Sequence, residues 1–226
     1  AVLEQGSDER YLCASRWTNG TITVMGNSIL SDPTQIEDAI IKGSGEAARP
    51  DVARTVAQNA KRTLEWLSAQ GVRFFQRIPD KDQPAHQVLA PPRRFQAGLD
   101  WEGRGGDVTM RLLEAQIKER GGEMLRGTKA EALIVTNGAC RGVDAIRNGE
   151  RIRIEAKAVV IADGGFPANR DMLARYITSH PDRVLCRAWS GSQGDGIRMA
   201  EAAGAATGGF GKFYGHVHHK DAMTNN

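Results

Sequence analysis

The chain has 226 residues, of which 40% are apolar and 25% are charged, and its formal net charge is +3. This composition is typical of an ordinary globular protein, and the length suffices for one large domain or two small ones. The basic residues are scattered, which argues against a nucleic-acid-binding face, and no apolar run approaches the roughly 20 residues of a membrane span.

The first predicted element is a strand at residues 1–4, and its pattern is already that of a strand at the first residue. There is no initiator methionine, and residues 223–226 close the sequence without a capping residue. We therefore expect the chain to be a fragment of a longer protein.

The pattern from about residue 32 to residue 72 is helical. Pro50 suits a first helical turn and Gly71 suits a helix exit. Five apolar residues at spacings of four, four, four and three are expected to form one buried face: Val52, Val56, Ala60, Leu64 and Leu67.

Residues 75–106 carry several prolines and glycines, so we expect a long ordered loop that crosses a surface or lines a site. A helix over residues 108–120 follows and is stopped by Gly121-Gly122. Three short strands come next, over residues 130–136, 142–147 and 151–155. The turn dipeptides Asn-Gly at 137–138 and 148–149 separate them and predict an antiparallel meander.

Residues 158–166 (Ala-Val-Val-Ile-Ala-Asp-Gly-Gly-Phe) form an apolar run broken by two glycines. The pattern predicts a buried parallel strand whose carboxyl end lets a backbone or a ligand phosphate come close. A helix, a meander and then a buried strand fit a doubly wound α/β sheet with a β-meander as its crossover, an architecture typical of FAD domains.

Three segments carry a resemblance to a known family: residues 163–169, residues 191–200 and Tyr214-Gly-His216. Together they resemble the fumarate reductase/succinate dehydrogenase flavoproteins and their soluble relatives, such as tricarballylate and 3-ketosteroid dehydrogenases. Residues 15–20 (Ser-Arg-Trp-Thr-Asn-Gly) resemble the family's segment near the flavin and are called the flavin segment below.

The resemblance implies an incomplete, glutathione-reductase-like FAD-binding domain over residues 1–210, without its first strand and glycine-rich turn. Residues 211–226 would begin a truncated substrate-cap domain. The implied activity is hydride exchange between FAD and a carbon–carbon bond next to a carboxylate or ketone of a small-molecule substrate. The alternative is a stable, non-catalytic fold fragment that retains no cofactor.

The resemblance also assigns cofactor contacts. Glu4 would accept hydrogen bonds from the adenosine ribose, and the backbone of Ala130 would meet the adenine. In the flavin segment, four residues would approach the pyrophosphate and isoalloxazine through short side chains and N–H groups: Ser15, Thr18, Asn19 and Gly20. An exposed strand-end glutamate, plain strand packing and an ordinary polar turn are the respective alternatives. Residues 12–14 depart from the family's Gly-Gly-Asn.

Three further assignments follow the predicted strand. Ala162 and Gly164 would lie beside the cofactor, or would simply form a tight turn. Asp195, between two glycines, would form a hydrogen bond on the flavin side, or an Asx-turn. His216 stands at the family's spacing for a histidine that binds a substrate carboxylate, with a solvated histidine-rich tail as its alternative.

We expect no metal site, because no carboxylate or cysteine at matching spacing joins the three histidines at 216, 218 and 219. The three cysteines are odd in number and lack metal-ligand spacing, which favours inert thiols in a reducing compartment. The expected location is therefore the cytoplasm. The sequence leaves the oligomeric state open.

Overall fold

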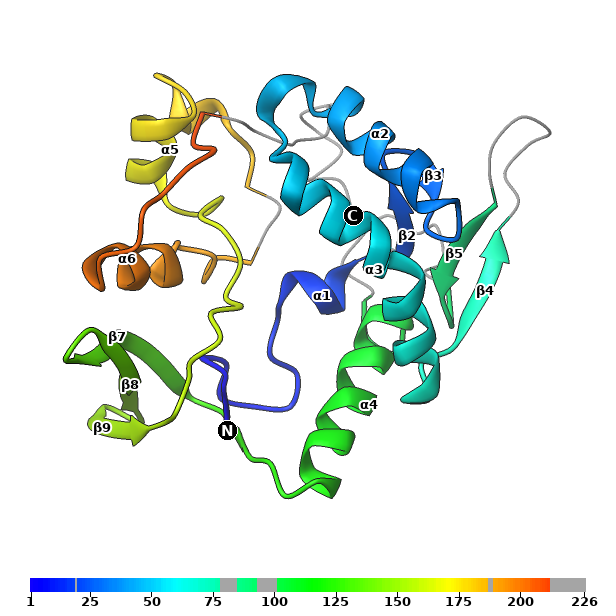
Figure 1. Cartoon of the computed structure of the whole chain (residues 1–226). Coiled ribbons are helices and arrows are strands. Elements are labelled where there is room, and N and C mark those ends of the chain that lie inside the picture. Colours follow the sequence, from blue (N-terminus) through cyan, green and yellow to red (C-terminus); the bar gives the residue numbers. More distant parts are fainter. Residues whose placement is uncertain (19, 78–84, 93–100, 187–188, 212–226) are drawn as a thin grey trace. The chain divides into compact units, whose positions relative to one another are not determined.

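The computed structural model describes residues 1–18, 20–77, 85–92, 101–186 and 189–211 (Figure 1). The chain divides into two compact units. Residues 1–14 and the described residues from Gly121 onward form the first unit, and residues 15–120 form the second. The α/β class predicted from the sequence is confirmed, because both units combine helices with sheets.

The first unit opens with a short parallel sheet. Strand β1 (Val2–Leu3) pairs with β6 (Met124–Leu125), so that Val2 lies opposite Met124. The Glu4 N–H donates to the Leu125 carbonyl at 3.0 Å, which extends the pairing by one residue. The strand expected at residues 1–4 is therefore present.

The predicted meander is confirmed. Strands β7 (Thr128–Thr136), β8 (Ala139–Arg147) and β9 (Glu150–Glu155) form an antiparallel sheet in the order β7-β8-β9 (Figure 1). Both residues of each Asn-Gly turn have positive φ, from 51° to 85°. Positive φ at both central positions is the requirement of the hairpin turn whose twist matches that of the strands.

The buried strand predicted over residues 158–162 is wrong. No described strand pairs with this segment, and the Val160 side chain is 88% exposed. A parallel strand forms only where a neighbour satisfies its backbone groups. In the described part of the chain, parallel pairing is confined to the two residues each of β1 and β6.

Helices follow the segment that ends at Gly165. Helix α5 (Arg170–Tyr176) is capped by Asn169, whose side-chain oxygen accepts from the Met172 N–H at 3.0 Å. A 3₁₀ turn, η2 (Pro181–Arg183), and helix α6 (Asp195–Ala202) come after it. Met172, Leu173 and Met199 are buried and anchor the two helices.

The second unit contains a four-stranded antiparallel sheet in the order β3-β2-β5-β4. Its strands are β2 (Thr21–Val24), β3 (Asn27–Ser28), β4 (Phe74–Arg77) and β5 (His86–Leu89). The prediction of a continuous loop over residues 75–106 is wrong, because β4 and β5 lie in it. Of the prolines that suggested a loop, Pro91 and Pro92 follow β5 and therefore remove no ladder hydrogen bond from it.

The helical pattern predicted from about residue 32 to residue 72 is confirmed but is divided between several elements. They are helix α2 (Pro33–Gly43), a 3₁₀ turn η1 (Gly45–Ala47) and helix α3 (Pro50–Ala69). Arg49 is extended, with ψ of 122°, because the ring of the following proline disfavours helical backbone at the preceding residue. Helix α3 begins at Pro50 and is followed by Gly71 with φ of 94°, as predicted.

The predicted buried face of α3 is partly wrong. Val52 and Val56 are 49% and 45% exposed. The residues that α3 buries are instead Ala53, Ala57, Ala60 and Leu64. Helices α2 and α3 lie side by side (Figure 1), and Ile36 of α2 forms one core with Ile29 and with Ala57, Ala60 and Leu64 of α3. Alanines let two helices approach closely, so close packing selects this face over the more apolar valines.

Helix α4 (Gly105–Glu119) confirms the helix predicted over residues 108–120 and starts three residues earlier. Its first turn packs against helix α1 (Ala14–Trp17). A Cβ added to Gly106 would lie 2.5 Å from the Ser15 carbonyl oxygen, and one added to Gly105 would lie 2.6 Å from that of Leu89. Only glycine permits these approaches, so the helix start carries two glycines.

Candidate functional site

The predicted cofactor residues fall in both units. The first unit holds Glu4, Ala130, Ala162, Gly164 and Asp195, and the flavin segment belongs to the second. Asn19 and His216 lie outside the described residues.

A pocket of about 520 Å³ in the first unit brings two predicted residues together. Its lining residues are Ile161, Ala162, Asp163, Gly164, Gly196, Ile197 and Ala200. This volume lies within the usual range for small-molecule sites. Gly164 has φ of 85°, and a Cβ added there would meet nothing within 4 Å. The small side chains therefore leave open space beside the backbone, which fits the close approach of a flat cofactor.

Asp163 ties this pocket to the start of α6. Its Oδ2 accepts a hydrogen bond of 2.7 Å from the Gly196 N–H. A Cβ at Gly196 would overlap both Asp163 Oδ1 and Ile161 Cγ2. Asp163 was not among the predicted site residues, since its partner lies 33 residues away and no local pattern encodes that pairing.

Asp195 is the first residue of α6 and is held by two cations. It forms an ion pair with Arg198 on the same helix, and its Oδ2 lies 3.9 Å from Lys129 Nζ on β7. The preceding Gly194 adopts φ of 74°, where an added Cβ would lie 2.8 Å from Met172 Sδ. The carboxylate is thus fixed in place and connects α6 to the meander.

Glu4 lies at the end of β1 and is half-buried. Its Oε1 accepts from the Gly6 N–H at 2.6 Å, and its backbone carbonyl accepts from the Thr128 N–H at 2.9 Å. Ala130 lies on β7 opposite Ala145. Glu4 and Ala130 therefore both lie near the start of β7, the first strand of the meander.

In the second unit, the flavin segment turns sharply at its end. The Thr18 hydroxyl accepts from the Gly20 N–H at 3.1 Å, and Gly20 has φ of 79°. A Cβ at Gly20 would lie 2.8 Å from Leu89 Cβ, and the Gly20 carbonyl accepts from the Leu89 N–H at 2.9 Å. Both the positive φ and this contact require glycine.

A buried ion pair links the flavin segment to the first turn of α4. Arg16 and Asp107 are each 1% exposed, and Arg16 Nε lies 3.4 Å from Asp107 Oδ1. Asp107 Oδ2 also accepts from the Gly103 N–H at 2.9 Å and from Arg111 Nε at 3.0 Å. Sequence reasoning missed this pair because charged side chains are ordinarily exposed. The usable signal was an aspartate in the first turn of a helix that opens with Gly-Gly.

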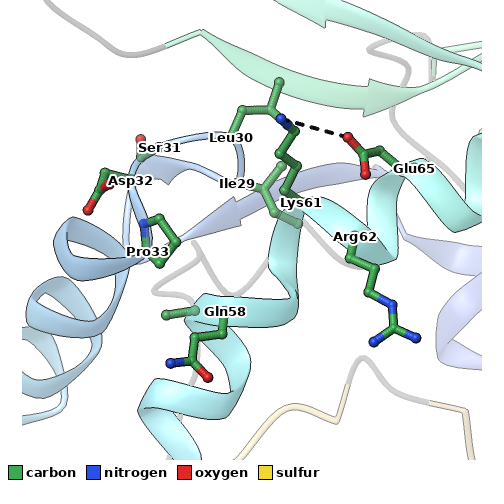
Figure 2. A pocket seen from close by; sticks show the side chains of 10 residues that line it. Ile29, Leu30, Ser31, Asp32, Pro33, Gln58, Lys61, Arg62 and Glu65 are labelled. Carbon is green, nitrogen blue, oxygen red and sulfur yellow. Dashed lines mark ion pairs between the residues drawn. The ribbon is translucent and has the colours of Figure 1, made fainter.

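A second pocket, of about 440 Å³, lies in the second unit between the start of α2 and α3 (Figure 2). Lys61 and Glu65 on its wall form an ion pair of 3.8 Å (Figure 2). The residues that line it include none of the predicted site residues, so we assign it no role.

The described ranges contain no group of three or more histidine, cysteine or acidic side chains that could hold a metal ion. No helix in the same ranges has both the length and the apolar character needed to cross a membrane.

Comparison with known proteins identifies the family. The model of the family described as "FAD binding domain" matches residues 1–216. The chain is 26% identical over 177 residues to NADH:fumarate oxidoreductase of Klebsiella pneumoniae, covering 78% of this chain and 18% of that protein. It is 29% identical over 172 residues to urocanate reductase of Eggerthella lenta, covering 75% and 27%.

A solved structure shares the fold. The 3-ketosteroid-Δ4-(5α)-dehydrogenase of Rhodococcus jostii RHA1, in complex with 4-androstene-3,17-dione, superposes with a TM-score of 0.73 at 20% sequence identity. The alignment covers 91% of this chain and 48% of the dehydrogenase. The chain thus spans about half of that structure and under a third of the two curated relatives.

Proposed function

Because this chain belongs to the FAD binding domain family, we propose that it is the FAD-binding part of a flavin-dependent oxidoreductase. The whole enzyme would exchange hydride with a carbon–carbon bond next to a carboxylate or ketone. The family match over residues 1–216 carries the proposal. The names of the relatives support the substrate class, since fumarate and urocanate are unsaturated carboxylates and androstenedione is an unsaturated ketone.

FAD supplies the redox chemistry when bound, and the protein supplies position and charge. In the first unit, Ala162 and Gly164 would border the cofactor, as the open space beside Gly164 allows. Glu4 would accept hydrogen bonds from the ribose hydroxyls, and the backbone of Ala130 would meet the adenine. Asp195, already oriented by Lys129, would act on the flavin side.

In the second unit, the flavin segment would approach the pyrophosphate and isoalloxazine through Ser15, Thr18, Asn19 and Gly20. The sharp turn at Gly20 supports this, because its positive φ favours glycine. Glycine has no side chain to keep a cofactor away from the backbone. Residues 1–210 would form the FAD-binding domain, and residues 211–226 the start of a substrate cap.

His216 would bind the substrate carboxylate or carbonyl oxygen, where a hydrogen-bond donor stabilises the charge that develops during hydride transfer. Its spacing from Gly194 supports the assignment. In the full-length enzyme, we expect His216→Ala to slow turnover more than it weakens FAD binding. Unchanged turnover would contradict this role.

The cofactor proposal is tested on the chain itself. We expect the purified chain to keep a flavin absorption band after incubation with FAD and removal of the unbound cofactor. The absorbance should correspond to about one FAD per chain. Free FAD at about 100 times its Kd should raise the free energy of unfolding by about 2.7 kcal/mol. A colourless chain without a thermal shift in excess FAD would contradict cofactor binding by this chain.

One observation favours the second candidate, a stable fragment that retains no cofactor. The segment that ends at Ala162 is not part of a sheet, and Val160 is exposed, so one wall of the proposed site lacks the support of neighbouring strands. The two candidates separate when the full-length enzyme and this chain are titrated with FAD in parallel. Binding by the longer protein alone would establish the second candidate.

We also propose a cytoplasmic location. The support is chemical: the three cysteines are odd in number and lack metal-ligand spacing, which suits thiols in a reducing compartment. Fractionation of cells that express the full-length protein tests the proposal, and recovery from an extracytoplasmic fraction would contradict it.

A further inference from the structure

We propose that Asp107 is a positioning residue for FAD, which holds the flavin segment in its binding conformation through Arg16. The inference rests on the proposed function, because the flavin segment is assigned to the cofactor there. Asp107 itself would not touch FAD. It lies on the first turn of α4, whereas Arg16 lies on α1 within the flavin segment.

Three groups converge on the carboxylate of Asp107. Asp107 takes a hydrogen bond from the Gly103 N–H, an ion pair from Arg111 and an ion pair from Arg16. Asp107 therefore joins the chain before α4, the body of α4 and the flavin segment at one point.

Beside this ion pair, the backbone of α4 at Gly106 closely approaches the backbone of the flavin segment. A Cβ at Gly106 would lie 2.5 Å from the Ser15 carbonyl oxygen and 2.9 Å from that of Arg16. The start of α4 thus touches the peptide groups of the flavin segment directly. A rigid support of this kind is what a binding site requires, since a displacement of about 0.5 Å already disturbs productive geometry.

The negative charge at position 107 also matters, because it faces the buried Arg16. Arg16 is 1% exposed and lies 5.8 Å from the centre of the Trp101 ring, so its guanidinium is removed from water. A buried guanidinium needs an ionised partner. An amide at position 107 could still accept the hydrogen bond from Gly103 but would not supply the negative charge that faces Arg16. Asp107→Asn therefore removes the ion pair and keeps the shape.

Glu114 provides the matched control. It is a buried acidic residue on the same helix, about two turns further along. It forms an ion pair of 2.8 Å with Lys118 on α4 itself. Glu114→Gln thus perturbs the charge and stability of α4 at a distance from its contact with the flavin segment.

The test combines FAD titration with hydrogen exchange on the full chain, below the unfolding temperature of every variant. We expect Asp107→Asn to raise the Kd for FAD at least tenfold and to alter the circular dichroism of the bound flavin. Glu114→Gln should change the Kd less than twofold. Without FAD, Asp107→Asn should speed amide exchange in residues 15–20 and leave α3 unchanged. Should Asp107→Asn not fold, Arg16→Gln, which removes the charge from the other side of the pair, is judged by the same criteria.

Equal FAD affinity and equal exchange in Asp107→Asn would overturn the inference, as would an equal loss of affinity in Glu114→Gln. Failure of the unchanged chain to bind FAD would overturn the proposed function, and this role with it. Unchanged FAD affinity in Asp107→Asn, with normal binding by the unchanged chain, would overturn the positioning role alone. The two failures are therefore distinguishable.

Discussion

Two carboxylates hold the proposed cofactor segments of the two units, and they do so in different ways. Asp107 in the second unit is 1% exposed and is surrounded by two arginines and a backbone N–H. Asp163 in the first unit is exposed and accepts from the Gly196 N–H at the start of α6. The flavin segment is therefore held by buried charge, whereas the pocket at Ala162 and Gly164 is held by an exposed helix cap.

This contrast predicts the largest effect at Asp107. Asp107→Asn breaks the buried ion pair with Arg16, which should lower the free energy of unfolding by about 3–5 kcal/mol. Urea denaturation followed by circular dichroism measures the change. A loss below about 1 kcal/mol would show that the Arg16–Asp107 pair is open to water in solution. Asp107 and Asp163 would then not differ in burial.

Gly196→Ala tests the crowding at the start of α6. The new methyl group would overlap the Asp163 carboxylate and the Ile161 side chain, so we expect a loss of about 1–3 kcal/mol, typical of overpacking. Gly208→Ala is the matched control, because that position is exposed and an added Cβ meets nothing within 4 Å. Equal urea midpoints for the two variants would contradict the contact between Asp163 and α6.

Asp163→Ala tests the cap itself. Removal of the acceptor leaves the Gly196 N–H unpaired at the helix start, and loss of such a cap costs about 1 kcal/mol. Asp163→Asn keeps an acceptor oxygen and should retain most of the stability. A loss as large as that of Asp107→Asn would mean that Asp163 is buried in solution and that both units use the same device.

Val160→Thr tests the exposure of the segment before the pocket. Val160 is 88% exposed, so the change should alter the free energy of unfolding by less than about 0.5 kcal/mol. Val143→Thr, at a buried position of β8, should cost about 1–3 kcal/mol because it buries a hydroxyl. Similar losses for both would restore the buried strand that the sequence predicted.

The elements that were predictable from sequence are those with a local cause. The Asn-Gly turns of the meander specify positive φ within two residues, and Pro50 and Gly71 mark the limits of α3 by backbone chemistry alone. The strand at residues 158–162 was predicted wrongly because an apolar run records what could be buried, whereas strand formation depends on partners elsewhere in the chain.

In the candidate site, too, features with a local cause were predictable and contacts between distant residues were not. Ala162 and Gly164 could be placed at one pocket because small residues that close an apolar run are a local pattern. The links from Asp107 to Arg16 and from Asp163 to Gly196 span distant parts of the sequence. No periodicity connects residues so far apart, and a charged residue is read by default as exposed.

The meander offers a third carboxylate, for which we expect the smallest effect. Asp144 on β8 forms an exposed pair with Arg153 on β9, with Nε 2.8 Å from Oδ1. The hydrogen bond from Arg153 holds the pKa of Asp144 below its ordinary value of 3.8. A lowered pKa in the folded state means that the stabilisation is complete above 3.8 and is lost as the pH falls through the folded-state pKa.

Asp144→Asn should therefore lower the melting temperature slightly at pH 7, and the difference from the unchanged chain should shrink as the pH falls below 3.8. High salt at pH 7 should also shrink it, because ions screen exposed pairs. Asp107→Asn, by contrast, should keep its full effect in salt, since screening reaches buried charges much less. A salt response of equal size in both variants would show that burial does not separate these carboxylates, and the comparison between the units would fail.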